Sequence, residues 1–150
     1  MRKILCAIAL VVLVTPAFAA DKFAGTWKLN TQKSTGPSTP TAEQLVSTGD
    51  GTDRLIAVSG KAPDGSPIMT KFSVPMKGGT GKIIDAVPFT SVKSKPFKDT
   101  SEEFMFMIDG KPVMQIHSVL SSDGKVMTAT RKVMGGPVKP GTYTDVWEKQ

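Results

Sequence analysis

Along most of the chain, short stretches rich in Val, Ile, Thr, Phe and Met alternate with glycine-containing turn signals. Regularly spaced stretches of this kind are typical of an all-β sandwich or barrel built from hairpins, and no segment has a convincing helical period. The turn signals lie at Gly49-Asp50-Gly51, Pro63-Asp64-Gly65, Gly78-Gly79-Thr80-Gly81, Asp109-Gly110, Asp123-Gly124 and Gly135-Gly136. The pattern predicts strands over residues 23–30, 43–49, 53–61, 67–74, 82–90, 102–109, 112–121, 125–133 and 142–149, with 31–42 and 91–101 as irregular connections.

The double hairpin near the C-terminal end has the clearest pattern. Asp109-Gly110 suits a two-residue turn, because Asp and Gly tolerate the positive φ angles that such a turn needs. This turn sets Met105 opposite Met114 and Phe106 opposite Val113. We expect Asp123-Gly124 to form the same kind of turn. It sets Leu120 opposite Met127 and Ser118 opposite Ala129.

Side chains of a strand point alternately to the two faces of a sheet, so this register divides the double hairpin into two faces. We place the purer apolar face inside a barrel, and it consists of Met105, Met107, Met114, Ile116, Leu120, Met127 and Ala129. We place the mixed face outside, and it consists of Phe104, Phe106, Val113, Gln115, His117, Thr128 and Thr130.

The first residues have the order of a secretory leader. Arg2 and Lys3 precede an apolar run over residues 4–14, Pro16 ends the run, and Ala17-Phe18-Ala19 supplies the small residues that a signal peptidase needs. The run is shorter than the ~20 residues that cross a bilayer, so we expect no stable membrane anchor. We predict a cleaved signal peptide over residues 1–19, with cleavage after Ala20 as the alternative, and one domain over 20–150 in a periplasmic or secreted protein.

Loss of the leader changes the composition in two ways. It removes Cys6, the only cysteine, and it lowers the formal net charge from +6 to about +4 because Arg2 and Lys3 leave. No disulfide is then available, so packing and hydrogen bonds must stabilise the domain. The remaining lysines are dispersed, as solvated loop charges are, and few aromatic residues could stack on bases. We therefore expect no nucleic-acid binding.

Both ends of the domain resemble the calycins, the superfamily of lipocalins and fatty-acid-binding proteins. Phe23-Ala24-Gly25-Thr26-Trp27-Lys28-Leu29 resembles the strand that closes the base of those barrels, and residues 144–149 resemble the last strand of the intracellular fatty-acid-binding group. Most of residues 23–150 is similar to a family of secreted bacterial lipocalin-like proteins. These open with Gly-Thr-Trp-Lys-Leu-Asn, have a nearby Lys-Ser, here Lys33-Ser34, and run through Asp-Gly-Lys hairpins. The resemblance implies an all-β fold, an antiparallel up-and-down β-barrel of about eight or nine strands.

The resemblance also assigns structural positions, namely Gly25, Trp27, Arg131 and Trp147. Trp27 is expected to plug one barrel end, with its indole N–H satisfied locally. In lipocalins a basic residue from a late strand packs over this tryptophan, and Arg131 is the candidate here.

The chain departs from the fatty-acid-binding pattern at the ligand clamp. That group has an Arg and, two residues on, a Tyr that hold the ligand carboxylate, and the chain has Asp145 and Trp147 at those positions. Gly36, Pro37 and Pro40 also exclude the helical lid between the first two strands. We therefore expect an apolar or uncharged ligand rather than a free fatty acid.

No catalytic set can be assembled from the sequence. His117, the only histidine, is adjacent to Ser118, but neighbours on a strand face opposite ways, and no Gly-x-Ser-x-Gly elbow exists. The thioethers of Met105, Met107 and Met114 would suit Cu(I), although methionine is ordinary filler in irregular cores. We expect no enzyme activity, no metal and no cofactor, with copper as the less favoured alternative.

Two functions remain open. In the first, the barrel binds a small apolar molecule in a cavity lined by Met105, Met107, Met114, Ile116, Leu120 and Met127. In the second, the barrel is filled, and Phe104 and Phe106 form a surface patch that contacts another protein. The interior volume distinguishes the two, because ligand cavities measure several hundred Å3.

Overall fold

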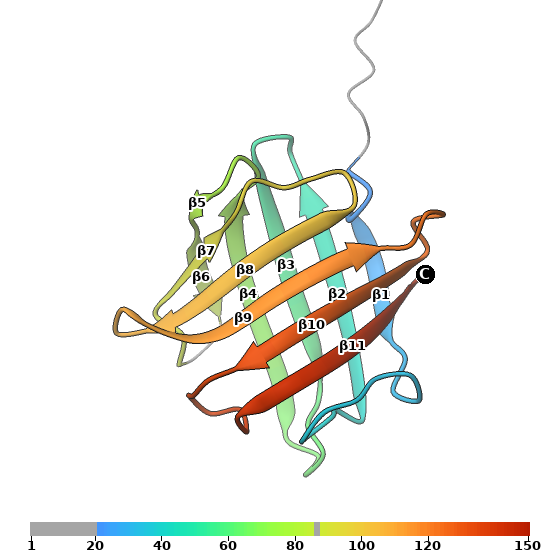
Figure 1. The fold of residues 1–150 in the computed structure, drawn as a ribbon, viewed down its shortest axis with the longest axis vertical. Coiled ribbons are helices and arrows are strands. Elements are labelled where there is room, and N and C mark those ends of the chain that lie inside the picture. The colour runs from blue at the N-terminus through green and yellow to red at the C-terminus, as the bar shows by residue number, and fades with distance from the viewer. Residues whose placement is uncertain (1–20, 86–87) are drawn as a thin grey trace, which may run out of the picture.

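The computed structural model describes residues 21–85 and 88–150, and the predicted signal peptide lies outside them. The described residues form strands and turns, and among them no helix has the length and apolar character needed to cross a membrane. Eleven strands are present in these residues (Figure 1). They are β1 (Gly25–Leu29), β2 (Ala42–Gly49), β3 (Asp53–Lys61), β4 (Pro67–Pro75), β5 (Gly79–Thr80), β6 (Lys82–Asp85), β7 (Ser91–Ser94), β8 (Ser101–Ile108), β9 (Lys111–Leu120), β10 (Val126–Val133) and β11 (Gly141–Lys149).

The strands form one antiparallel sheet that curls into a nearly closed barrel. Their order is β5-β7-β8-β9-β10-β11-β1-β2-β3-β4-β6, and β4 and β6 return beside β7 (Figure 1). Two hydrogen bonds tie these edges together. The Gly81 N–H donates to the Val92 carbonyl at 2.8 Å, and the Ser94 hydroxyl donates to the Pro75 carbonyl at 3.0 Å. The predicted all-β antiparallel barrel is confirmed.

The strand count differs from the expected eight or nine. Each predicted strand has a counterpart, but β5 and β7 were missed. β7 lies in residues predicted as an irregular connection, although it pairs with β8, and β5 lies within a predicted glycine turn. Both strands are short, with two and four residues, so neither has enough positions for alternation to be recognised.

The face assignment of the β8–β9 hairpin was wrong. The turn itself is as predicted, since Asp109 and Gly110 have φ angles of 48° and 76°. A β-bulge between Phe106 and Met107 then shifts the register by one residue, so that Phe106 pairs with Met114. A one-residue shift moves a strand's side chains to the other face. Phe104 and Phe106 therefore point inward and are buried, and Met105 lies on the outer face.

The next hairpin has the predicted register but a different turn. Leu120 pairs with Met127, and Ser118 pairs with Ala129. Among the described residues, Asp109 is the only non-glycine with positive φ, so Asp123-Gly124 is not a two-residue turn of the Asp109-Gly110 kind. Instead, the Ser121 and Asp123 side chains hydrogen-bond within a longer loop.

Trp27 closes one end of the barrel, as predicted. Its side chain is fully buried, and its indole N–H donates to the Phe23 carbonyl at 2.9 Å. The cation over its ring is Lys149, 5.0 Å from the centroid, and not Arg131. Lys149 pairs with Trp27 across β1 and β11, whereas Arg131 lies opposite Tyr143. Tyr143 is six residues from Lys149, roughly 20 Å along the strand.

Candidate functional site

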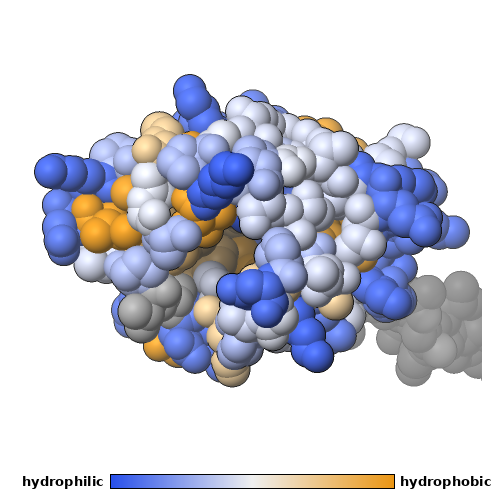
Figure 2. All heavy atoms as spheres, turned by 90° about the horizontal axis from the view of Figure 1, so that it is seen from below, coloured by the Kyte–Doolittle hydropathy of each residue, from blue (hydrophilic) through white to orange (hydrophobic). Residues whose placement is uncertain are grey.

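The barrel encloses a cavity of about 490 Å3. Viewed from below Figure 1, the space-filling surface is hollowed at its centre, with apolar residues inside the hollow (Figure 2). The rim includes residues 62–64 between β3 and β4, residues 137–139 between β10 and β11, and Ser38 and Pro40. The Trp27 end is at the opposite end of the strands, so the cavity has one closed end and one open end.

Most of the cavity wall is apolar. Phe72 packs edge-on against Phe104 and Phe106, with ring centroids 5.7 and 5.0 Å away, and Phe89 packs against Phe106 at 5.0 Å. The two contacts of Phe72 are edge-to-face, an arrangement that aromatic pairs prefer. Aliphatic residues and methionines complete the apolar lining, namely Leu45, Ile56, Val58, Ile68, Met114, Ile116 and Met127.

Half of the predicted pocket residues line this cavity. Met114, Ile116 and Met127 do, as the alternation on β9 and β10 indicated. Leu120 is buried in the cluster around Trp27 and Phe23. Met105 and Met107 do not line the cavity, because the bulge places Phe104 and Phe106 there instead.

A charged set lies in the wall toward the open end. Arg131 donates to Asp145 through two bonds, Nε to Oδ2 at 2.9 Å and Nη2 to Oδ1 at 3.1 Å. Its guanidinium also lies 4.4 Å from the centre of the Tyr143 ring. Asp145 is the residue that the sequence resemblance set at the position of a clamp arginine. Here it occupies Arg131 and leaves less of that guanidinium available for a ligand carboxylate.

Glu43 is the third member of this set and has no ion pair within the described part of the chain. Desolvation by burial raises the pKa of Glu43 to about 7, against the lowering effect of Arg131 and with a further increase from Asp145. Gly60 lies opposite Glu43 on β3, and a Cβ there would come within 2.7 Å of the Glu43 Cγ. The missing side chain thus leaves room for Glu43 at the cavity wall.

A second charged set lies at the closed end. Arg54 is 1% exposed and binds the carboxylates of both Asp21 and Glu102. Its guanidinium lies over Phe23 and Phe97, 5.1 and 4.3 Å from the ring centres. Desolvation raises the pKa of Glu102 to about 7 against the opposing charge of Arg54. The sequence reasoning missed Arg54, Glu43 and Glu102. A charged residue at an inward position of an alternating strand was the signal, as in Arg54-x-Ile56-x-Val58.

Ser47 contributes a polar atom that lacks a partner. Its hydroxyl lines the cavity, the residue is 3% exposed, and no hydrogen bond to another described residue satisfies the hydroxyl. A buried hydroxyl without a partner is costly. Ser47 therefore offers a hydrogen bond to a molecule inside the barrel.

The other residues with candidate chemical roles do not come together in one site. His117 is exposed on β9, and Ser118 faces inward beside Glu102, so the two side chains point to opposite faces. Met105 and Met114 lie on opposite sides of the wall. Residues 21–85 and 88–150 contain no group of three or more His, Cys, Asp or Glu side chains that could hold a metal ion.

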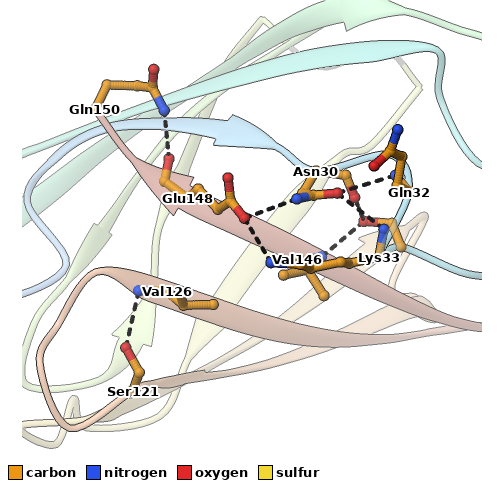
Figure 3. A network of polar contacts seen from close by, with 9 residues as sticks. Asn30, Gln32, Lys33, Ser121, Val126, Val146, Glu148 and Gln150 are labelled. Carbon is orange, nitrogen blue, oxygen red and sulfur yellow. Dashed lines mark hydrogen bonds and ion pairs between the residues drawn. The ribbon is translucent and has the colours of Figure 1, made fainter.

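The Lys33-Ser34 pair, which supported the family resemblance, fixes a connection on the outside of the barrel (Figure 3). Lys33 Nζ and Asn30 Nδ2 donate to Glu148 at 3.1 and 2.8 Å. The Ser34 hydroxyl donates to the Asn30 carbonyl and accepts from the Val146 N–H at 2.9 Å. These contacts hold the segment after β1 against β11, so this motif is structural.

No family model matches the chain, and no curated protein matches it. Solved structures that resemble this chain include two β-barrel proteins bound to DFHBI. A redesigned β-barrel, mFAP1, bound to DFHBI has a TM-score of 0.48 and 14% identity over 85% of this chain and 95% of its own. EF1p2_mFAP2b bound to DFHBI has a TM-score of 0.47 and 14% identity over 88% of this chain and 97% of its own.

Proposed function

We propose that the chain is an exported, non-enzymatic lipocalin-like barrel that binds a small, largely apolar ligand in its interior. The observation that carries this proposal is the cavity of about 490 Å3, open at one end and walled mainly by aromatic and aliphatic side chains. Ligand cavities typically measure roughly 300–1,000 Å3 and combine an apolar wall with a few placed polar groups.

The alternative of a filled barrel that acts through its surface has less support. It relied on Phe104 and Phe106 as an exposed patch, and these residues are 4% and 1% exposed. Their rings form part of the cavity wall. The alternative therefore loses the surface feature that recommended it.

Cavity-blocking variants analysed by native mass spectrometry test the proposal. Wild-type protein purified from its own host is expected to have a small-molecule adduct that Ile116→Trp lacks, because Ile116 faces the cavity. Val119→Trp is the matched control, since Val119 lies on the same strand and is 42% exposed. The absence of an adduct in wild type, together with no uptake of added 1-decanol, would contradict a binding function.

Export is tested by sequencing the N-terminus of protein recovered outside the cytoplasm. We expect a start at Ala20, or at Asp21 if cleavage follows Ala20. Both positions keep Asp21, whose carboxylate binds Arg54 at the closed end. A mature form that retains Cys6 would contradict the predicted leader.

A further inference from the structure

We propose that the ligand has a protonated amine, which sits between Glu43 and Asp145 while its apolar body fills the aromatic part of the cavity. This inference rests on the proposed binding function and narrows its ligand class. It follows from the charged groups in the barrel interior. Acidic groups outnumber basic ones there, whereas basic residues outnumber acidic ones in the whole chain.

The interior has more acids than bases. Four carboxylates, from Asp21, Glu43, Glu102 and Asp145, accompany the two guanidinium groups of Arg54 and Arg131. The whole chain has a formal net charge of +6. The rim adds one charge of each sign, from Lys139 and Asp64, and leaves the balance unchanged. Burial without a further cation raises the pKa of Glu43 and Glu102 to about 7, and a cation bound beside these carboxylates would favour their ionised forms, as an anion would not.

Glu43 is the carboxylate left for such a cation. Glu102 already binds Arg54 and has Ser118 beside it, and Asp145 is held by both donors of Arg131. Glu43 lies in the cavity wall without an ion pair to any residue in 21–85 or 88–150. Burial makes its ionised form unfavourable while the cavity holds no cation, and an ammonium group would reverse that.

The strand geometry places the two carboxylates at a useful spacing. β1 alone separates β2, which carries Glu43, from β11, which carries Asp145. Two strand spacings amount to roughly 10 Å between backbones. The β1 register sets Glu43 level with Trp147, two residues along β11 from Asp145, and both acidic side chains line the cavity. An ammonium group has three donors, so it can bind Glu43 and Asp145 together while Arg131 stays on Asp145.

Ser47 supplies a second, independent indication of a ligand. Its unpartnered hydroxyl is buried in the same cavity wall, on the same strand as Glu43. Ser47 is four positions after Glu43, roughly 13 Å along β2, and Leu45 lines the cavity between them. A ligand with its amine at Glu43 would extend over an apolar surface and place its far end beside Ser47.

Three probes with the same alkyl chain test the charge preference: decylamine, 1-decanol and decanoate. Binding is followed by Trp147 fluorescence, since this indole lines the cavity, and by calorimetry at 0.15 M salt and pH 8, where Glu43 is mostly ionised. We expect decylamine to bind at least tenfold more tightly than decanoate, with decanol between them. Binding of decanol together with equal or tighter binding of decanoate would overturn the amine proposal and leave the apolar cavity intact. Binding of none of the three would contradict the binding function itself.

Glu43→Gln separates a specific contact from a general charge effect. This variant should lose at least tenfold in decylamine affinity and keep its decanol affinity. Glu148→Gln is the control, because it removes the same charge from the outer face, where Glu148 binds Lys33 and Asn30. It should leave both affinities unchanged. Equal loss of decylamine binding in the two variants, or no loss in Glu43→Gln, would overturn the assignment of Glu43. Unchanged decanol binding in Glu43→Gln shows that the variant is folded.

Discussion

The two ends of the barrel each hold an arginine beside two carboxylates, but only at the closed end does the arginine bind both of them. At the closed end, Arg54 binds both Asp21 and Glu102 and is covered by two aromatic rings. At the open end, Arg131 binds Asp145 alone, lies against one ring and is 15% exposed, and Glu43 has no cation within the described residues.

Chemically similar groups therefore differ in role: the Arg54 set stabilises the fold, whereas the Glu43 set forms the proposed ligand site. A buried charge is tolerated when its partners and hydrogen bonds are in place, and the Arg54 set meets that condition within the protein. The Glu43 set does not meet it within the protein, and it borders a cavity that a molecule can enter.

The largest effect is expected at the closed end. Trp27→Ala should lower the free energy of unfolding by about 3–5 kcal/mol, because it truncates a large, fully buried aromatic side chain. Urea unfolding measures this loss. Phe89→Ala is the comparison at the cavity wall, where the ring is half-buried and the loss should be smaller. A loss below about 1 kcal/mol for Trp27→Ala, the range of surface changes, would mean that Trp27 does not plug the barrel.

Substitution of the two arginines should also cost more stability at the closed end than at the open end. Arg54→Met should cost about 3–5 kcal/mol, because it leaves the buried Glu102 and the partly buried Asp21 without their cation. Arg131→Met should cost less, about 1–3 kcal/mol, since Asp145 faces a cavity that water can enter. Chemical denaturation of both variants under one set of conditions gives the comparison. Equal losses would contradict the distinction between a complete and an incomplete charged set.

The hairpin β8–β9 gives an intermediate effect and tests the bulge. Met114→Ala should cost about 2 kcal/mol, because Met114 is buried against the cavity wall. Met105→Ala, on the outer face, should cost less than about 1 kcal/mol. Thermal or urea unfolding of the pair is sufficient. An unbulged hairpin would place both side chains on one face, so similar losses would favour that register.

The same hairpin shows what the sequence could predict. Alternation and turn chemistry are local properties, so the all-β class, nine of the eleven strands described and the Asp109-Gly110 turn could be predicted. The bulge depends on how β8 packs in the finished barrel, and no residue type at Phe106 or Met107 announces it. Two of the three errors in the candidate pocket follow from that one residue, since the bulge brings Phe104 and Phe106 to the cavity in place of Met105 and Met107. The third, Leu120, has the predicted register but is buried at the closed end.

The charged sets could be predicted only in part. Asp145 and Trp147 were identified because the resemblance assigned their positions, and the prediction that a fatty-acid clamp is absent depended on them. Arg131 was placed over Trp27, but β11 brings Lys149 there instead. Asp21 and Arg54 are 33 residues apart in the chain and meet only when the barrel closes, so no local pattern connects them.

The smallest predicted effect is a gain in stability at the open end. The folded pKa of Glu43 is about 7 against an ordinary value of 4.5, so the folded state holds a proton between those pH values that the unfolded state has released. This contribution to stability is complete below about pH 4.5 and is lost as the pH rises through 7. Glu43→Gln removes the titration, and it should raise the free energy of unfolding by about 1–2 kcal/mol at pH 8 and leave it nearly unchanged at pH 4.5.

Urea unfolding at the two pH values, with Glu148→Gln as the control, decides whether Glu43 is an acid that lacks its partner. Asn30 and Lys33 lower the pKa of Glu148, so Glu148→Gln should remove favourable contacts at pH 8 and give no gain there. Decylamine should then abolish the advantage of Glu43→Gln at pH 8, because an ammonium group stabilises the ionised carboxylate that the variant has lost. If Glu43→Gln gains nothing at pH 8, then the ionised form of Glu43 is already stabilised within the protein, and the ligand assignment loses its basis.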